Sequence, residues 1–157
     1  MAKEENLVVI EEVNAGNFDC FLGLINKLAE YEKLAPPNEE AKKRLRSDCL
    51  SDKPKFRAFI GKVGDKYVSY IIFFYTYSSF LGSPTLFLED IFVLDEHRRQ
   101  GVGNKMFDFL KETAKREGCG RIEFTVLKWN KLAQAFYEKN GAQRLEWYLY
   151  RVAQTDF

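Results

Sequence analysis

The stretch from Thr85 to Thr113 constrains the fold more than any other part of the chain. It begins with a run of apolar residues up to Leu94, which has the composition of a buried strand. A basic turn that contains glycine follows. Apolar side chains then recur at helical spacing, at Val102, Met106, Phe109, Leu110 and Thr113. A strand, a turn and an amphipathic helix in this order predict a helix that packs against a sheet.

The rest of the chain repeats strands and helices without an internal repeat or a linker. Branched and aromatic runs predict further strands at 7–13, 56–61, 67–77, 121–127 and 145–152. Apolar periodicity and capping residues predict helices at 18–34, 39–49 and 130–139. We therefore expect one mixed α/β domain over residues 1–157, with a core from about 6 to 152.

Composition limits the kinds of partner that the protein can have. The 157 residues are 46% hydrophobic and 30% charged, as in one globular domain with a substantial core. The net charge of +1 gives no reason to expect nucleic acid or a membrane as a partner. The run Tyr67 to Tyr77 is shorter than the roughly 20 residues of a membrane helix. The start of the chain has no features of a secretory signal, so we expect a soluble, cytoplasmic protein.

Two acids stand side by side in the apolar strand, at Glu89 and Asp90. Consecutive strand residues point to opposite faces, so at least one of these carboxylates should face inward unless a bulge intervenes. Burying a carboxylate is costly, and a chain that does so normally uses it. The pair is therefore a candidate functional site.

The basic turn, Arg98-Arg99-Gln100-Gly101-Val102-Gly103, lies at the start of the predicted helix. Free amide groups and the positive end of the helix dipole attract anions there, and glycine lets a diphosphate approach the backbone. The alternative is a solvated basic loop. The spacing of a nucleotide-triphosphate loop is absent, and so is a G-x-G-x-x-G dinucleotide fingerprint.

The turn resembles the R/Q-x-x-G-x-G/A motif of the GNAT superfamily of N-acetyltransferases, which is matched by Arg98, Gly101 and Gly103. Two longer runs, LEDIFVLDEHRRQGVG and EFTVLKWNKLAQAFYEKNGA, are similar to the spermidine/spermine acetyltransferase branch. That branch includes diamine and thialysine acetyltransferases. The similarity runs from Tyr31 to about Tyr150.

The resemblance implies a fold and a donor. The fold is a mixed, mostly antiparallel, twisted sheet of about seven strands flanked by about four helices. The donor is acetyl-CoA. Its pantetheine arm pairs with the backbone in an opening between two neighbouring parallel strands. The enzymes of this branch are homodimers. The residues that the resemblance assigns to the cofactor are Ile91, Phe92, Val93, Arg98, Arg99, Gln100, Gly101, Val102, Gly103, Asn104, Asn130, Lys131, Leu132 and Ala133.

Acetyl transfer needs a neutral amine, whereas a free alkylamine has a pKa near ~10.4. The site must therefore attract a cation and then remove its proton, which a carboxylate can do directly or through water. Glu89 matches the acid that the branch uses near the reacting amine, and Tyr137 matches its general acid, which protonates the departing thiolate. Backbone amides splayed by a bulge after Asp90 would stabilise the oxyanion. The acetyl group would move by direct attack in a ternary complex.

The identity of the amine stays open at this point. The residues that the resemblance and their charge assign to the substrate are Tyr31, Glu32, Glu89, Asp90 and Glu146. Where the polyamine enzymes have Tyr-Asp-Pro-Trp, residues 77–80 read Tyr-Ser-Ser-Phe, which weakens the case for a long polycation. A small polyamine or diamine and a lysine-like amino acid such as thialysine are both compatible, and so is an acyl-CoA sensor without turnover. With His97 as the sole histidine, neither a histidine triad nor a histidine metal cluster is expected.

Overall fold

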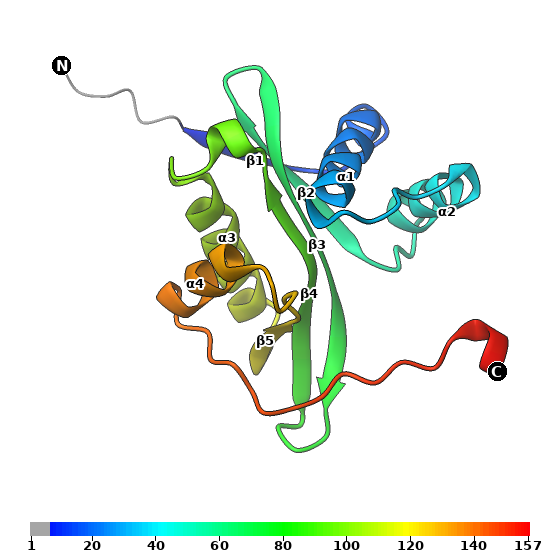
Figure 1. Cartoon of the computed structure of the whole chain (residues 1–157), viewed down its shortest axis with the longest axis vertical. Coiled ribbons are helices and arrows are strands. Elements are labelled where there is room, and N and C mark those ends of the chain that lie inside the picture. Colours follow the sequence, from blue (N-terminus) through cyan, green and yellow to red (C-terminus); the bar gives the residue numbers. More distant parts are fainter. Residues whose placement is uncertain (1–6) are drawn as a thin grey trace. The chain divides into compact units, whose positions relative to one another are not determined.

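The computed structural model describes residues 7–157 (Figure 1). The start of the chain, where the sequence predicts no secretory signal and where the core was expected to begin, lies outside the described residues. The chain divides after Phe124 into two compact units. Within the described part, none of the helices is long and apolar enough to cross a bilayer.

Five strands form one sheet in the first unit, in the order β1-β2-β3-β4-β5. Neighbours pair antiparallel from β1 to β4, whereas β4 and β5 pair parallel. Figure 1 shows β3 and β4 as one long hairpin. The strands are β1 (Val8–Glu12), β2 (Arg57–Val63), β3 (Lys66–Ser78), β4 (Ser83–Val93) and β5 (Arg121–Phe124).

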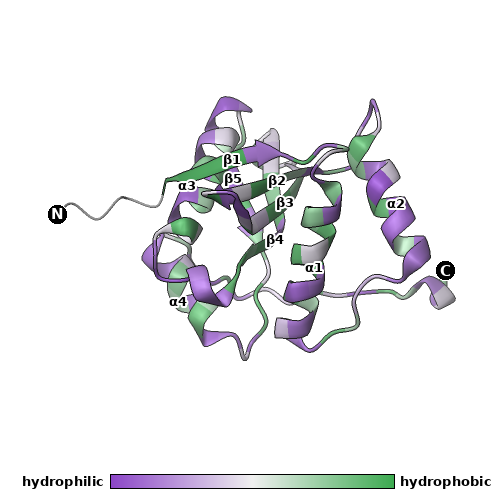
Figure 2. Cartoon of the chain, turned by 90° about the horizontal axis from the view of Figure 1, so that it is seen from above, coloured by the Kyte–Doolittle hydropathy of each residue, from purple (hydrophilic) through white to green (hydrophobic). Residues whose placement is uncertain are grey.

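Three helices cover the two faces of this sheet (Figure 2). Helices α1 (Phe18–Glu32) and α2 (Glu39–Leu50) lie on one side, and α3 (Val102–Arg116) lies on the other. Asn38 starts α2 as predicted, because its side chain accepts a hydrogen bond of 2.9 Å from the amide of Ala41. Helix α3 connects the parallel strands β4 and β5, as parallel pairing requires.

Because successive side chains of a strand point to opposite faces, the buried residues of the sheet form part of the core on each of its two faces. Tyr70 and Ile72 of β3 belong to a buried cluster with Phe21 and Leu24 of α1. Phe73, between Ile72 and Phe74, points to the opposite face. Its ring stacks on that of Phe59 with 5.9 Å between ring centres, and the ring of Phe59 lies 4.7 Å from that of Phe109 in α3. The face that packs on α1 is the one that carries the candidate site.

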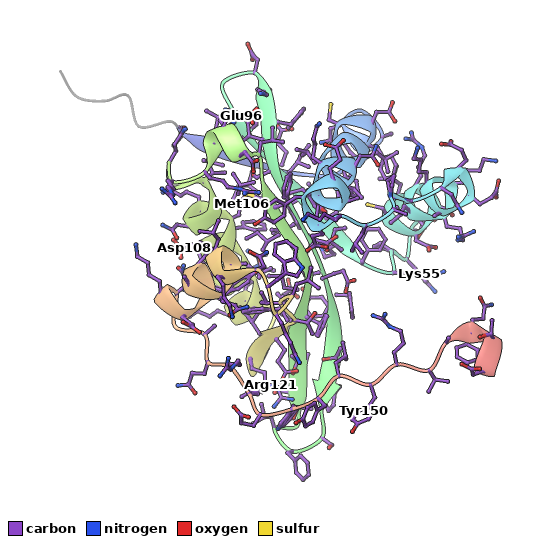
Figure 3. The ribbon with its side chains drawn as sticks, in the orientation of Figure 1. Lys55, Glu96, Met106, Asp108, Arg121 and Tyr150 are labelled. Atoms are coloured by element: carbon purple, nitrogen blue, oxygen red, sulfur yellow. The ribbon has the colours of Figure 1, made fainter. Side chains whose placement is uncertain are left out.

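Gly61 of β2 lets α3 approach the sheet closely. A Cβ atom at this position would collide with Ser69 Oγ and would lie 2.9 Å from the sulfur of Met106, which is labelled on α3 in Figure 3. Glycine is required here because of this contact.

The second unit contains α4 (Lys131–Lys139) and a short 3-10 turn, Gln154–Asp156. The expected sheet of about seven strands is wrong in number: the described residues form five strands, and 145–152 form none. A strand requires hydrogen bonds from a neighbouring strand, and this segment has none within the described chain. Its apolar side chains stay exposed, with 74% exposure for Trp147 and 88% for Tyr150.

Candidate functional site

A β-bulge in β4 lies at Glu89. Asp90 pairs with Ile72 and Leu88 pairs with the next residue, Phe73, so Glu89 has no partner in β3. The bulge was expected after Asp90, whereas the structure has it before Asp90, at Glu89. Because paired residues share a face, the extra residue moves Asp90 to the α1 side while Leu88 stays on the opposite side.

Both carboxylates line one small cavity on the α1 side of the sheet, with a volume of about 250 Å³. The other residues of its wall are apolar and come from α1, α2, β3 and the position just before β2. They are Ile25, Leu45, Phe56, Ile72 and Phe74. An apolar wall with two acids at one place suits an alkyl chain that ends in an ammonium group.

Negative charge gathers beside this cavity. Burial and the neighbouring charge of Glu89 raise the pKa of Asp90 to about 6, with a smaller contribution from Glu32. The hydroxyl of Tyr70 donates a hydrogen bond of 3.2 Å to Asp90 Oδ2, which acts in the opposite direction. Burial also raises the pKa of Glu32, at the end of α1. The structure thus brings together three acids that were predicted from the sequence to bind the substrate.

Beyond Leu88, β5 no longer pairs with β4. The parallel pairing with β5 ends at Leu88 and Phe124, whereas β4 continues to Val93. Within the described residues, the stretch from Glu89 to Val93 therefore pairs on the β3 side only. Ile91, Phe92 and Val93 were predicted to bind pantetheine amides through their backbone, and this edge offers backbone groups for such pairing.

The basic turn leads into the first turn of α3. Gly101, which precedes the helix, has φ +84°, and Arg99 has φ +59°, so both adopt the left-handed conformation. No acidic residue lies in the first turn of α3, in contrast to α1 with Asp19 and α2 with Glu39. The positive end of the helix dipole is therefore not offset by a neighbouring acid, and it can attract an anion.

The guanidinium of Arg98 is engaged by other groups of the protein. It donates to the carbonyl oxygen of Val93 at 3.0 Å and forms an ion pair of 2.7 Å with Asp95. It also lies 4.5 Å from the ring centre of Tyr31 and 5.7 Å from that of Phe92. Arg98 thus fastens the turn to the end of β4 and to α1.

The second unit holds the other predicted residues. Asn130 caps α4, since its side chain accepts a hydrogen bond of 3.1 Å from the amide of Ala133, as the sequence predicts. Lys131 and Leu132 lie in the first turn of this helix. Tyr137 is buried and packs edge-on against Phe136, with 5.4 Å between ring centres. Glu146 is exposed in the irregular segment.

Sequence reasoning missed Tyr70 and the apolar wall of the cavity. Tyr70 precedes Ile72 by two residues and therefore shares its face, which is a readable signal. Only the register of β3 against β4, however, shows that this face carries Asp90.

Comparisons with known proteins show the family of this chain. The family model of the acetyltransferase (GNAT) family matches residues 24–142. A thialysine N-epsilon-acetyltransferase from Bos taurus is 33% identical over 92% of this chain and 91% of its own length. The protein of the same name from Sus scrofa is 34% identical over 88% and 85%. An L-ornithine N5-acetyltransferase from Arabidopsis thaliana is 38% identical over 66% of this chain and 46% of its own length.

Solved structures share the fold at lower identity. A possible acetyltransferase from Clostridium difficile 630 has a TM-score of 0.81 at 23% identity, with 94% of this chain and 97% of that chain covered. An aminoglycoside N-acetyltransferase in complex with CoA has a TM-score of 0.79 at 18% identity, covering 98% and 99%. The family model over residues 24–142 and the relatives at 33% and 34% identity lead to one conclusion: this chain belongs to the GNAT family and is an acetyl-CoA-dependent N-acetyltransferase.

Proposed function

We propose that the enzyme acetylates the terminal amine of a lysine-like amino acid, of the kind represented by thialysine and ornithine. The observation that carries this proposal is the small cavity of about 250 Å³ with Glu89 and Asp90 at one place and apolar side chains around them. A single ammonium on a short alkyl chain matches this arrangement. The similarity to thialysine and ornithine acetyltransferases supports the same class of substrate.

A short diamine or polyamine is the second candidate. Glu32 favours it, because this third acid interacts electrostatically with Asp90 and could accept from a second ammonium. Against a long polycation, the two acids of the cavity lie at one place, so that ammonium groups spaced along such a chain would lack acidic partners in the cavity.

The carboxylates have two tasks in this proposal. The amine has a pKa of about 10.4, about three units above pH 7, so nearly all of it is in the ammonium form, and this form binds to the carboxylates first. Removing its proton at pH 7 costs roughly 4 kcal/mol. Glu89, the more exposed acid, then takes the proton, directly or through water. Asp90, which is more buried, holds the nitrogen in place. The neutral amine attacks the acetyl carbon directly in a ternary complex.

Acetyl-CoA is the acetyl donor, and we propose that its pantetheine arm pairs with the backbone of Ile91, Phe92 and Val93. The diphosphate would lie on the amides of residues 99–104, at the start of α3, where no acid offsets the dipole. Arg98 would hold this turn through Val93 and Asp95. Residues 130–133 would add contacts from α4. Tyr137 would give the proton to the thiolate of CoA as it leaves.

The first prediction concerns the amine. In a thiol-release assay with acetyl-CoA, thialysine and ornithine should give a kcat/KM at least about tenfold above that for spermidine, because the cavity accommodates one ammonium and a short alkyl chain. Putrescine and lysine complete the panel as matched diamine and amino acid. A preference for spermidine over all amino acids would reject the lysine-like class, and tight binding of acetyl-CoA without any turnover would favour a sensor.

The second prediction separates the two proton roles. Glu89→Gln should lower kcat/KM by about 10²-fold or more at pH 7 and recover toward high pH, where the free amine is abundant. Tyr137→Phe should lower kcat with little change in the KM for acetyl-CoA, because its hydroxyl acts only on the leaving group. The measurement is a pH series of initial rates for both variants.

Phe136→Leu is the matched control for the helix that carries Tyr137, and it should keep most of the activity. A Glu89→Gln profile that parallels the parent at every pH would remove Glu89 from the base role. An unchanged kcat in Tyr137→Phe would do the same for the acid role.

The homodimer remains our proposal for the assembly. Residues 145–152 expose a run of large apolar side chains, with exposures of 74% for Trp147, 84% for Tyr148, 74% for Leu149 and 88% for Tyr150. An exposed apolar patch of this kind marks an association surface. Light scattering should give twice the chain mass of 18.3 kDa, and Trp147→Ser with Tyr150→Ser should reduce it to one chain. A monomeric parent protein would contradict the proposal.

The cytoplasm is the proposed location. The structure leaves Cys20, Cys49 and Cys119 as free thiols, which suits a reducing compartment. Cell fractionation tests it, and recovery from an oxidising compartment would contradict it.

A further inference from the structure

The side chain of Tyr70 is a buried group with a polar hydroxyl that contacts the candidate site and that the reaction described above does not use. It lies in the middle of β3 and is 0% exposed. Its ring packs edge-on against Phe21 at 5.5 Å and is tilted against Phe92 at 6.2 Å. Its hydroxyl donates to Asp90 Oδ2 at 3.2 Å.

A phenylalanine would fill the same space and make the same ring contacts without burying a hydroxyl. A buried hydroxyl costs free energy unless it has a hydrogen-bond partner, and here that partner is a carboxylate. A hydrogen bond to a charged group is stronger than one between neutral groups. The hydroxyl at position 70 is therefore explained by Asp90 rather than by core packing.

The charges around Asp90 oppose its ionisation. Glu89 lies beside it on β4, and Glu32 faces it from the end of α1. Burial is the largest of the effects that oppose the ionisation of Asp90, ahead of the repulsion by these two side chains. The hydroxyl of Tyr70, which comes from β3, is the interaction that favours the charged form of Asp90. It also fixes the direction of the carboxylate, because Oδ2 is held while Oδ1 is left for another donor.

We propose that Tyr70 is a positioning residue of the amine site: its hydroxyl keeps the Asp90 carboxylate ionised and directs its second oxygen toward the substrate ammonium. Tyr70 touches neither substrate nor acetyl-CoA in this proposal and acts through Asp90. The role in catalysis rests on the proposed function, whereas the effect on Asp90 is a property of the free protein.

The test is the substitution Tyr70→Phe, followed by two separate readouts. The first is the titration of the Asp90 carboxyl in the free protein, observed by carbon NMR after labelling of the aspartates and assigned with Asp90→Asn. In the parent, this pKa should lie at about 6. In Tyr70→Phe it should rise, because the hydrogen bond that favours the charged form is lost.

The second readout is the pH dependence of kcat/KM for the amine. Protonation of Asp90 removes the negative charge that binds the ammonium, so activity falls as the pH drops through its pKa. In Tyr70→Phe this acid limb should move to higher pH, with a loss of roughly tenfold near pH 6 and of less than about twofold near pH 8.5. A purely structural role of the ring would lower activity equally at all pH values.

The matched control is Tyr67→Phe, on the same strand. The Tyr67 hydroxyl also donates to a carboxylate, Glu11 Oε2 at 2.9 Å, on a different element. This variant loses the same kind of bond and should leave both the Asp90 titration and the acid limb unchanged. Equal shifts in the two variants would overturn the specific role of Tyr70.

A second substitution keeps the proposal testable if Tyr70→Phe does not fold. Replacement of Tyr70 by 3-fluorotyrosine makes the hydroxyl a stronger donor, so the pKa of Asp90 should fall instead of rise. An Asp90 titration that is unchanged in both variants would refute the proposal. If the parent acetylates no amine while the titration shifts as expected, the proposed function fails but the effect of Tyr70 on Asp90 stands.

Discussion

The unpaired residue Glu89 in β4 is the constraint on which the site depends. One extra residue changes the alternation of the strand, so that Leu88 points toward α3 while Asp90 points toward α1. If the same residues alternated regularly, Asp90 would share the face of Leu88, which packs on α3. The bulge also lies where the pairing between β4 and β5 ends. A single local irregularity therefore directs two carboxylates into a cavity beside a strand edge with free backbone groups.

Two electrostatic environments follow one another along β4 and its continuation. At the bulge, Glu32, Glu89 and Asp90 create a negative field suited to a cation. At the far end, the start of α3 is positive and suited to an anion. Arg98 links the two, because it binds the last carbonyl of β4 and packs on Tyr31. A substrate amine and a diphosphate can thus be attracted to one strand at different ends.

The sequence predicts the local elements well and the distant pairings poorly. The helices at 39–49 and 130–139 are confirmed, since Asn38 and Asn130 cap them. From the adjacent Glu89 and Asp90 the sequence predicts an inward carboxylate unless a bulge intervenes, but whether and where a bulge forms depends on the register with β3, which no short pattern encodes. The segment 145–152 has strand composition, yet strand formation needs a partner that composition does not supply. The roles of Arg98 and Tyr70 depend on residues from three elements and become visible only in the fold.

The most direct test of this account is a crystal structure of the enzyme with CoA and a lysine-like amine, a pair that cannot react. The account predicts the ammonium nitrogen within hydrogen-bond distance of Glu89 or Asp90, and the pantetheine amides paired with the backbone of 91–93. An amine bound away from both carboxylates, or a pantetheine arm that leaves this edge of β4 bare, would contradict it.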